Sequence, residues 1–281
     1  MPLTNLQIEV LRLLAAQRSS DSYVAGGAAL NHDGPRFSSD IDIFQDSQDR
    51  LDSAADADGA TLIRAGFELS WVGRRRTGNR TARVQGPAET ILLEWVADSD
   101  FRFFPSQPDE LFGYVLHPVD LAANKASAAA DRREPRDIVD LITIHRRILH
   151  LGAVITAAVG RFPGLTPEEM LAEITRHSRF TAEEFRALST EHPLDTGEVH
   201  RNIRAMLEDA EAFISQVPSE FVGVVFLEAD GTVLHLPDPS RLASYQSREG
   251  SRRGLWPTSS AIDRAMLESY DRRGGETLPD S

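Results

Sequence analysis

Two aspartates at alternate positions, Asp40 and Asp42, have the clearest chemical potential in this sequence. Residues 37–44 alternate between polar and apolar types, which predicts a β-strand, and side chains two positions apart on a strand point to the same face. Two carboxylates arranged in this way can hold one or two Mg²⁺ or Mn²⁺ ions. The alternative is the exposed polar face of a strand whose other face enters the core, although neighbouring like charges are unfavourable without a cation.

A glycine pair, Gly26 and Gly27, precedes these aspartates and lies between a predicted strand at 23–25 and a predicted helix at 28–30. Glycines at such a turn let backbone N–H groups approach a triphosphate closely, and the following helix adds partial positive charge. Either motif alone is weak evidence. Their order, with Ser38 between them, predicts a site for a nucleoside triphosphate and a divalent metal.

A third acid, Glu94, lies within the apolar segment 90–96, which is predicted to be a strand. An acid inside an apolar strand needs a partner. We therefore expect Glu94 either to join Asp40 and Asp42 as a metal ligand or to lie on the solvent face of its strand.

Only one of the 30 lysine and arginine residues is a lysine, Lys125. Its ammonium is a compact charge, whereas a guanidinium is a planar fork. Asp137 and Asp140 lie three positions apart on a predicted helix and so share a face, and a helical hairpin at Pro135 would fold them back towards Lys125. Lys125 is therefore expected to neutralise a triphosphate or to hold an aspartate in place. The alternative is a solvated pair of charged helices.

A basic segment without any acid lies between Gly73 and Ala88. On a hairpin beside the catalytic strands, its arginines can hold an RNA backbone. The formal charge of the whole chain is −13, so only a local patch of this kind can bind nucleic acid. A solvated turn is the alternative. The arginines of this basic patch are Arg74, Arg75, Arg76, Arg80 and Arg83.

The elements that must position these residues are predicted to be mixed in the first half of the chain and helical in the second. The first half comprises an amphipathic N-terminal helix, strands at 23–25, 37–44, 67–72, 80–85 and 90–96, and helices at 28–30 and 47–65. The second comprises helices at 119–133, 135–149, 163–177, 181–188 and 195–217, and a β-hairpin over 221–236 around Asp230-Gly231. We therefore predict an α+β core over residues 1–117 and a mostly helical domain over 118–281, with a frayed tail after Arg272.

The composition is that of a globular protein, with 41% hydrophobic and 26% charged residues. We find no membrane span and no signal peptide, and expect a cytoplasmic protein without a membrane partner. Because the chain has no cysteine, any metal must be held by oxygen or imidazole ligands. The eight histidines show no metal-ligand spacing. His145 and His150, five apart on one predicted helix, are expected to be surface residues on different faces.

The motifs follow one another in a recognisable order: Gly26-Gly27-x-Ala-Leu, Arg36-x-Ser38-x-Asp40-x-Asp42, Lys125, and Arg136-Asp137-x-x-Asp140-Leu141. Over residues 23–141 this arrangement resembles the AbiEii-like nucleotidyltransferase toxins, which include the MenT-type proteins of bacterial toxin–antitoxin systems. The resemblance implies a polymerase-beta-like nucleotidyltransferase core and a helical C-terminal domain that completes the active site. It also implies transfer of a nucleoside monophosphate from an NTP to the 3′ end of tRNA, which blocks translation, and an antitoxin as partner.

The resemblance also implies roles for single residues, by their positions in the motifs. Asp40 and Asp42 would bind metal, Lys125 would contact the triphosphate, and Asp140 would be the remaining essential acid. Ser38 matches a position that is phosphorylated in some relatives when the antitoxin silences the toxin. Two other functions stay open, namely nucleotidyl transfer to a small hydroxyl compound and nucleotide binding without catalysis.

Overall fold

A seven-stranded mixed sheet forms the centre of the first half of the computed structural model, which describes residues 2–76, 78–162 and 164–255. The order across the sheet is β3-β4-β5-β2-β1-β8-β7, and the pairs β2–β5 and β1–β8 are parallel. The expected fraying after Arg272 concerns residues outside this description. The strands of the sheet are β1 (Ser22–Ala25), β2 (Asp40–Gln45), β3 (Glu68–Arg76), β4 (Asn79–Gln85), β5 (Thr90–Ala97), β7 (Gln107–Asp109) and β8 (Gly113–Val115).

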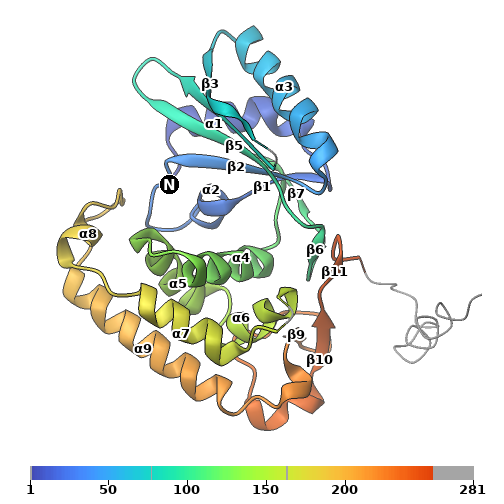
Figure 1. Ribbon diagram of the computed structural model, residues 1–281, viewed down its shortest axis with the longest axis vertical. Helices are drawn as coiled ribbons and strands as arrows, with labels where there is room; N and C mark the ends of the chain where they lie inside the picture. Colours follow the sequence, from blue (N-terminus) through green and yellow to red (C-terminus); the bar gives the residue numbers. More distant parts are fainter. Residues whose placement is uncertain (1, 77, 163, 256–281) are drawn as a thin grey trace, which may run out of the picture.

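Helices cover the two faces of this sheet differently. Helices α1 (Asn5–Leu14) and α3 (Gln48–Arg64) pack on one face, and the short α2 (Gly26–Leu30) lies on the other (Figure 1). Ile41 and Ile43 of β2 are fully buried in the same hydrophobic cluster as α1 and α3. Because side chains alternate along a strand, the acids of β2 point to the face on which α2 lies.

A buried acid of α3 fixes the orientation of β5. Asp58 accepts a hydrogen bond of 2.7 Å from Nε1 of Trp95 and forms an ion pair of 2.5 Å with Arg18. Trp95 is fully buried on the α3 face. Its neighbour Glu94 therefore points to the opposite face, as the acids of β2 do.

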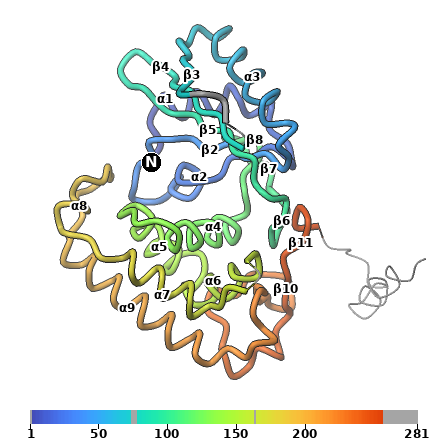
Figure 2. Tube along the Cα trace, viewed as in Figure 1, coloured from blue at the N-terminus to red at the C-terminus, as the bar shows by residue number. Residues whose placement is uncertain are grey.

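The second half of the chain is mostly helical. Its helices share one hydrophobic cluster, and α4 lies between α2 and the remaining helices (Figures 1 and 2). The predicted boundary at residue 118 is the first residue of α4, and the division into two domains stays a prediction. The helices of the second half are α4 (Pro118–Asp131), α5 (Pro135–Arg147), α6 (Leu151–Ala158), α7 (Pro167–His177), α8 (Ala182–Arg186) and α9 (Thr196–Ile214), with short 3₁₀ turns η2 (Val159–Arg161), η3 (Ser219–Phe221) and η4 (Pro239–Ser244); a further 3₁₀ turn, η1 (Ala15–Gln17), follows α1 in the first half.

Helix α6 was not predicted from the sequence. All eight of its residues are buried. A helix that is apolar on every side has no amphipathic periodicity, so the pattern that predicts a surface helix is missing. The predicted helix at 163–177 begins later, at Pro167, where Thr166 forms a capping box with Glu169. Pro163 lies outside the described residues.

The predicted hairpin over 221–236 is wrong in its second strand. Gly231 has φ +86° and its N–H donates to the carbonyl of Glu228, so the turn at Asp230-Gly231 does form. Beyond that turn, a bridge joins Leu227 to Val233, and the N–H groups of Leu234 and Glu228 donate to the carbonyls of Phe226 and Thr232, but no second strand forms over 232–236. Strand β9 (Val224–Leu227) pairs in addition with β10 (Gln246–Glu249), in an antiparallel register over its whole length.

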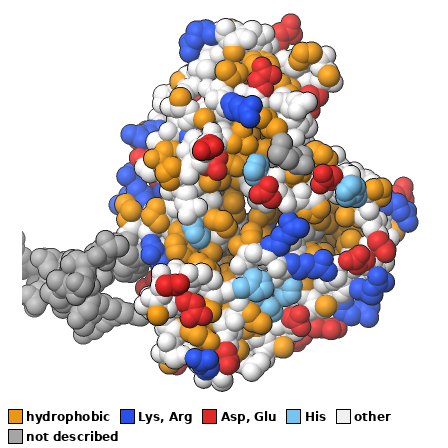
Figure 3. All heavy atoms as spheres, turned by 180° about the vertical axis from the view of Figure 1, so that it is seen from behind, with side chains coloured by type: hydrophobic (Ala, Val, Ile, Leu, Met, Phe, Trp, Pro, Cys, Tyr) orange, Lys and Arg blue, Asp and Glu red, His pale blue; other side chains and the backbone are white. Residues whose placement is uncertain are grey.

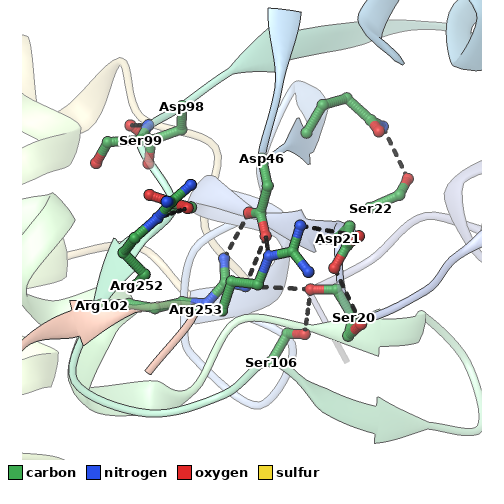
Figure 4. A network of polar contacts seen from close by, with 12 residues as sticks. Ser20, Asp21, Ser22, Asp46, Asp98, Ser99, Arg102, Ser106, Arg252 and Arg253 are labelled. Carbon is green, nitrogen blue, oxygen red and sulfur yellow. Dashed lines mark hydrogen bonds and ion pairs between the residues drawn. The ribbon is translucent and has the colours of Figure 1, made fainter. Parts of the chain in front are cut away.

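The last described residues return to the first half of the chain. Strand β11 (Ser251–Arg252) pairs with β6 (Phe101–Arg102). The guanidinium of Arg102 lies against Asp46 at 2.7 Å, and Arg253 adds ion pairs to Asp46 and Asp21 (Figure 4). This network ties the C-terminal part to the ends of the central strands β1 and β2. Within the described part of the chain, no helix has the length and apolar character that crossing a membrane requires.

Candidate active site

Three carboxylates meet on the α2 face of the sheet. Asp40 and Asp42 come from β2, and Glu94 of the parallel neighbour β5 lies in register with Asp42. One carboxylate oxygen from each of the three lies within 4.8 Å of the others. The sequence left two positions open for Glu94, one beside Asp40 and Asp42 and one on the solvent face of its strand. The structure shows the first.

Burial and the neighbouring carboxylates raise the pKa of Asp42 and of Glu94. Burial, followed by the neighbouring charges of Asp40 and Glu94, raises the pKa of Asp42 to about 7. The pKa of Glu94 is also raised, first by burial and then by Asp40. Three oxygen ligands with unfavourable mutual repulsion fit a divalent cation, which would relieve that repulsion.

Glycine at the turn between β1 and α2 allows the main chain to approach this cluster. Gly26 has φ +65°, and a β-carbon there would lie 1.7 Å from Oδ2 of Asp42. The backbone N–H of Gly27 donates to the carboxylate of Asp42, which lowers its pKa. A β-carbon on Gly27 would lie 2.6 Å from Oγ of Ser38. The turn, the serine and the carboxylate are therefore packed in direct contact.

Ser38 lies at the entrance to β2, next to the metal-binding candidates. Its hydroxyl donates to Oδ1 of Asp40 at 3.0 Å, and the residue is 5% exposed. The side chain of Gln7 holds the carbonyl of Ser38 at 2.7 Å. The hydroxyl therefore lines the site, and the backbone beneath it is fixed by α1.

Asp140 is fully buried behind this site rather than exposed in it. Arg36 donates to both its oxygens, at 2.9 and 2.8 Å, and Asn31 donates at 2.9 Å. Nζ of Lys125 lies 3.0 Å from Oδ2. Burial acts to raise the pKa of Asp140, but Lys125 and Arg36 outweigh it and hold the pKa below its usual value.

Asp137 holds Lys125 from the other side. Nζ of Lys125 lies 2.9 Å from Oδ1 of Asp137, and Arg132 donates to Oδ2 at 2.8 Å. The return of α5 towards Lys125, expected from Pro135, is confirmed by these contacts. Of the two roles considered for Lys125, the structure shows the second, an ammonium that holds aspartates, while the residue also lines the cavity.

A cavity of about 490 Å³ joins these groups. Three carboxylates lie on the sheet side, and Arg36, Lys125, Arg132 and Arg136 supply positive charge around them. Nη1 of Arg136 lies 3.7 Å from Asp40. The lining residues are Gly26, Gly27, Arg36, Ser38, Asp40, Asp42, Phe44, Glu94, Val96, Leu121, Asn124, Lys125, Ala128, Arg132 and Arg136.

Several of these residues were not predicted as site residues. Asn124, Arg132 and Arg136 lie on or beside α4 and α5 and face the cavity. Arg132 lies seven positions after Lys125, a two-turn spacing that could have indicated it, whereas Asn124, directly before Lys125, has no such spacing to Lys125. Asn31, which holds Asp140, has no such signal, because its contact spans 109 residues of sequence.

The basic patch is divided between the two faces of the sheet. Arg80 points towards α3, where it forms ion pairs with Asp52 and Asp56 and lies over the ring of Trp71. Thr81 is the cross-strand partner of Glu94, so Arg83, two positions further, lies on the active-site face, and it is exposed. Arg74, Arg75 and Arg76 belong to β3 in the same hairpin. Arg80 is thus engaged in the fold, whereas Arg83 is available to a ligand.

The expectation for the histidines is wrong. Helix α5 ends at Arg147, and His150 caps the next helix, so helical spacing does not apply. His150 is buried, and its ring centroid lies 4.7 Å from that of His145. Figure 3 shows histidine side chains gathered on the rear face.

These two histidines and Asp209 form a second group with metal-ligand spacing. However, Nδ1 of each ring accepts a backbone N–H, from Leu151 and Gly152, both at 3.2 Å. A neutral imidazole that accepts at Nδ1 carries its proton on Nε2, which then has no lone pair for a metal. We therefore assign these rings to the capping of α6.

Comparisons with known proteins show the family of the chain and the likeness of its fold. The chain matches the sequence profile of a family described as "Nucleotidyl transferase AbiEii toxin, Type IV TA system" over residues 12–221. No curated protein sequence matches it.

Among solved structures, the chain is similar to the MenT4 nucleotidyltransferase toxin of Mycobacterium tuberculosis H37Rv. The identity is 17% and the TM-score 0.52, over 77% of this chain and 84% of that one. Cid1, described as having RNA terminal uridylyl transferase activity, matches with 10% identity and a TM-score of 0.30, over 97% of this chain and 87% of that one. The likeness to the MenT4 toxin is one of fold.

Proposed function

This chain belongs to the AbiEii nucleotidyl transferase toxin family and is a nucleotidyltransferase, and from this premise we propose that it transfers a nucleoside monophosphate from an NTP to the 3′ end of tRNA. The family and the polymerase-beta-like fold expected from the motifs are confirmed. The observation that carries the proposal is the meeting of Asp40, Asp42 and Glu94 opposite the glycine turn in one cavity.

The proposed cofactor is Mg²⁺ or Mn²⁺, held by Asp40, Asp42 and Glu94. When bound, such an ion aligns the triphosphate, lowers the pKa of the attacking hydroxyl and neutralises charge on pyrophosphate. The repulsion among the three carboxylates supports this assignment, because a cation converts it into attraction.

The chain's own groups would bind and orient the triphosphate. The turn at Gly26 and Gly27 brings backbone close to the metal ligands, and the hydroxyl of Ser38 lies beside it. The guanidinium groups of Arg132 and Arg136 are partly exposed in the cavity and can neutralise phosphate oxygens. We propose that Lys125 contacts the triphosphate while remaining fixed by its aspartates.

Asp140 is proposed to be a positioning residue, although the family resemblance suggested an essential acid at this place. It is fully buried and holds Arg36 and Lys125, which both line the cavity. Removing its charge would leave two cations without their common partner. Its loss would therefore affect the reaction through the placement of those cations.

The acceptor is proposed to reach the site across the face that carries Arg83. The patch Arg74, Arg75, Arg76 and Arg83 would hold the RNA backbone, and the net charge of −13 of the whole chain would disfavour other contacts. Arg80 is removed from this assignment, since its partners belong to α3.

We also propose that Ser38 is the residue at which an antitoxin partner could silence the enzyme by phosphorylation. A phosphate adds up to about two negative charges. On Ser38 it would lie beside Asp40 and occupy space that the triphosphate needs. Ser38→Asp should therefore be inactive, whereas Ser38→Ala should retain nucleotide binding.

The proposed function is tested by incubating the full chain with each of four labelled NTPs, Mg²⁺ and total tRNA. Label on tRNA together with released pyrophosphate is the expected result. Label on a small hydroxyl compound but not on RNA would favour the small-molecule alternative. Nucleotide binding without pyrophosphate release from any acceptor would favour a catalytically silent binding protein.

A further inference from the structure

The cavity continues past the carboxylates into an apolar end. Phe44 follows Asp42 by two positions on β2, and Val96 follows Glu94 by two on β5, so both point into the same cavity. Leu121 of α4 lines the same space. Two residues along a strand span about 6.7 Å, which suits the nucleoside that extends from an α-phosphate at the carboxylates.

One polar side chain, Asn124, faces this region from α4. Its Oδ1 accepts a hydrogen bond from Nη1 of Arg161. A guanidinium has only donors, so the amide oxygen must face Arg161 and the amide Nδ2 must face the other way. Among the described residues, no acceptor is bonded to this Nδ2. The amide is therefore fixed with its two N–H donors towards the cavity.

Arg161 is itself held firmly. Its guanidinium lies 3.5 Å from Oδ2 of Asp98 and 3.2 Å from Oγ of Ser99, and its side chain is 11% exposed. Asp98 and Ser99 follow β5 directly and are drawn next to each other in Figure 4. The orientation of Asn124 is thus set from the end of the strand that also holds Glu94.

We propose that Asn124, positioned by Arg161, recognises the nucleoside half of the bound NTP by donating a hydrogen bond to an oxygen on it. The oxygen is a carbonyl of the base or the 2′ hydroxyl of the ribose. This inference rests on the proposed function, because it assigns the specificity of the same cavity. Phe44, Val96 and Leu121 would supply the apolar surface for the base.

The test is equilibrium binding of eight ligands to the full chain with Mg²⁺: UTP, CTP, GTP, ATP and their 2′-deoxy forms. The variants are Asn124→Ala, Arg161→Met and Arg161→Lys. Ser127→Ala is the matched control on α4, because its hydroxyl bonds only the carbonyl of Ala123. The melting temperature of every variant is recorded alongside, so that a loss of fold is recognised.

Recognition of a base carbonyl predicts that Asn124→Ala weakens at least one of UTP, CTP and GTP about fivefold and spares ATP, whose base has no oxygen. Recognition of the 2′ hydroxyl predicts a similar loss for all four ribonucleotides and none for the deoxynucleotides. Arg161→Met should reproduce the same change in discrimination. Arg161→Lys should retain part of the wild-type discrimination among the nucleotides, since an ammonium is also only a donor.

The inference is overturned if Asn124→Ala leaves all eight affinities unchanged, or lowers them all by the same factor. It is also overturned if Arg161→Met weakens binding without altering discrimination, because a purely structural role would do that. If the wild type binds none of the ligands, the proposed function fails together with the inference. If it binds and transfers normally while discrimination is unaffected in the variants, only the inference fails.

Discussion

Gly26 and Asp42 lie so close together that a β-carbon on residue 26 would be 1.7 Å from Oδ2 of Asp42. Gly26 also has φ +65°, a backbone conformation that residues other than glycine rarely adopt. Two independent causes therefore require glycine here. The contact sets the distance between the turn that would bind phosphates and the carboxylate that would bind metal.

We predict that Gly26→Ala reduces nucleotide transfer by about 10²-fold or more, because a displacement of the order of 1 Å in a catalytic group has that effect. The melting temperature should also fall. Gly66→Ala is the matched control, since Gly66 has φ +93° but a β-carbon added there would meet no atom within 4 Å. Equal behaviour of the two variants would show that backbone strain alone matters and that the contact with Asp42 does not.

Asp42→Asn should stabilise the metal-free protein at pH 8. The pKa of Asp42 is about 7 in the fold against an ordinary value of 3.8, so the folded form binds more protons between these values. The free energy of unfolding of the wild type therefore falls as pH rises through this window, by an amount on the order of 2 kcal/mol or more. The free energy of unfolding of Asp42→Asn does not fall in this way, because the asparagine side chain has no proton to lose in this pH range.

The measurement is thermal melting in a chelator at pH 4 and pH 8. The advantage of Asp42→Asn should be present at pH 8 and vanish near pH 4, and adding Mg²⁺ at pH 8 should stabilise only the wild type. Asp33→Asn, at a side chain that is 88% exposed, is the control and should show none of this. A variant less stable than the wild type at pH 8 would show that Asp42 is not destabilised by its neighbours.

The sequence patterns predicted the elements on which the site is built, and the reasons are local. Alternation in residues 37–44 placed Asp40 and Asp42 on one face, and Pro135 predicted the return of α5. Pairings between distant residues have no such local signature. Asn31 and Asp140 are 109 residues apart, and the pairing of β9 with β10 depends on a segment that shows no strong strand pattern.

The environment of Lys125 is a second feature that local sequence patterns could not predict. The scarcity of lysine indicated the residue, but an open, solvated position was equally compatible with the sequence. In the structure it is 9% exposed and is held by two aspartates. A substitution there must therefore affect stability as well as activity.

Lys125→Arg should lower transfer by about 10²-fold and destabilise the fold by about 1–3 kcal/mol, because the wider guanidinium overpacks a closed site. Single-turnover transfer and chemical denaturation measure the two effects. Arg132→Lys, at a side chain that is 47% exposed on the same Asp137, should be milder in both. Near-normal transfer by Lys125→Arg would remove Lys125 from the proposed triphosphate contact.

Arg83→Ala should weaken tRNA binding and reduce its salt dependence while leaving NTP binding unchanged, because Arg83 lies exposed on the active-site face. Arg80→Ala should do the opposite: it removes the ion pairs to α3 and the contact with Trp71, so it should lower the melting temperature with little effect on tRNA. Salt series of tRNA binding compare the two. Identical slopes for wild type and Arg83→Ala would exclude this residue from the RNA surface.

A transfer assay that compares the wild type with Asp40→Asn/Asp42→Asn tests most directly whether the aspartates drive nucleotide transfer to tRNA. Labelled NTP, Mg²⁺ and tRNA are used, and a parallel sample contains tRNA whose 3′ diol has been destroyed with periodate. We predict labelled tRNA and pyrophosphate with the wild type, no label on the oxidised tRNA, and neither product with the double variant, which should remain folded. Undiminished transfer by the folded double variant would contradict the assignment of the aspartates, and equal labelling of oxidised tRNA would contradict the 3′ end as acceptor.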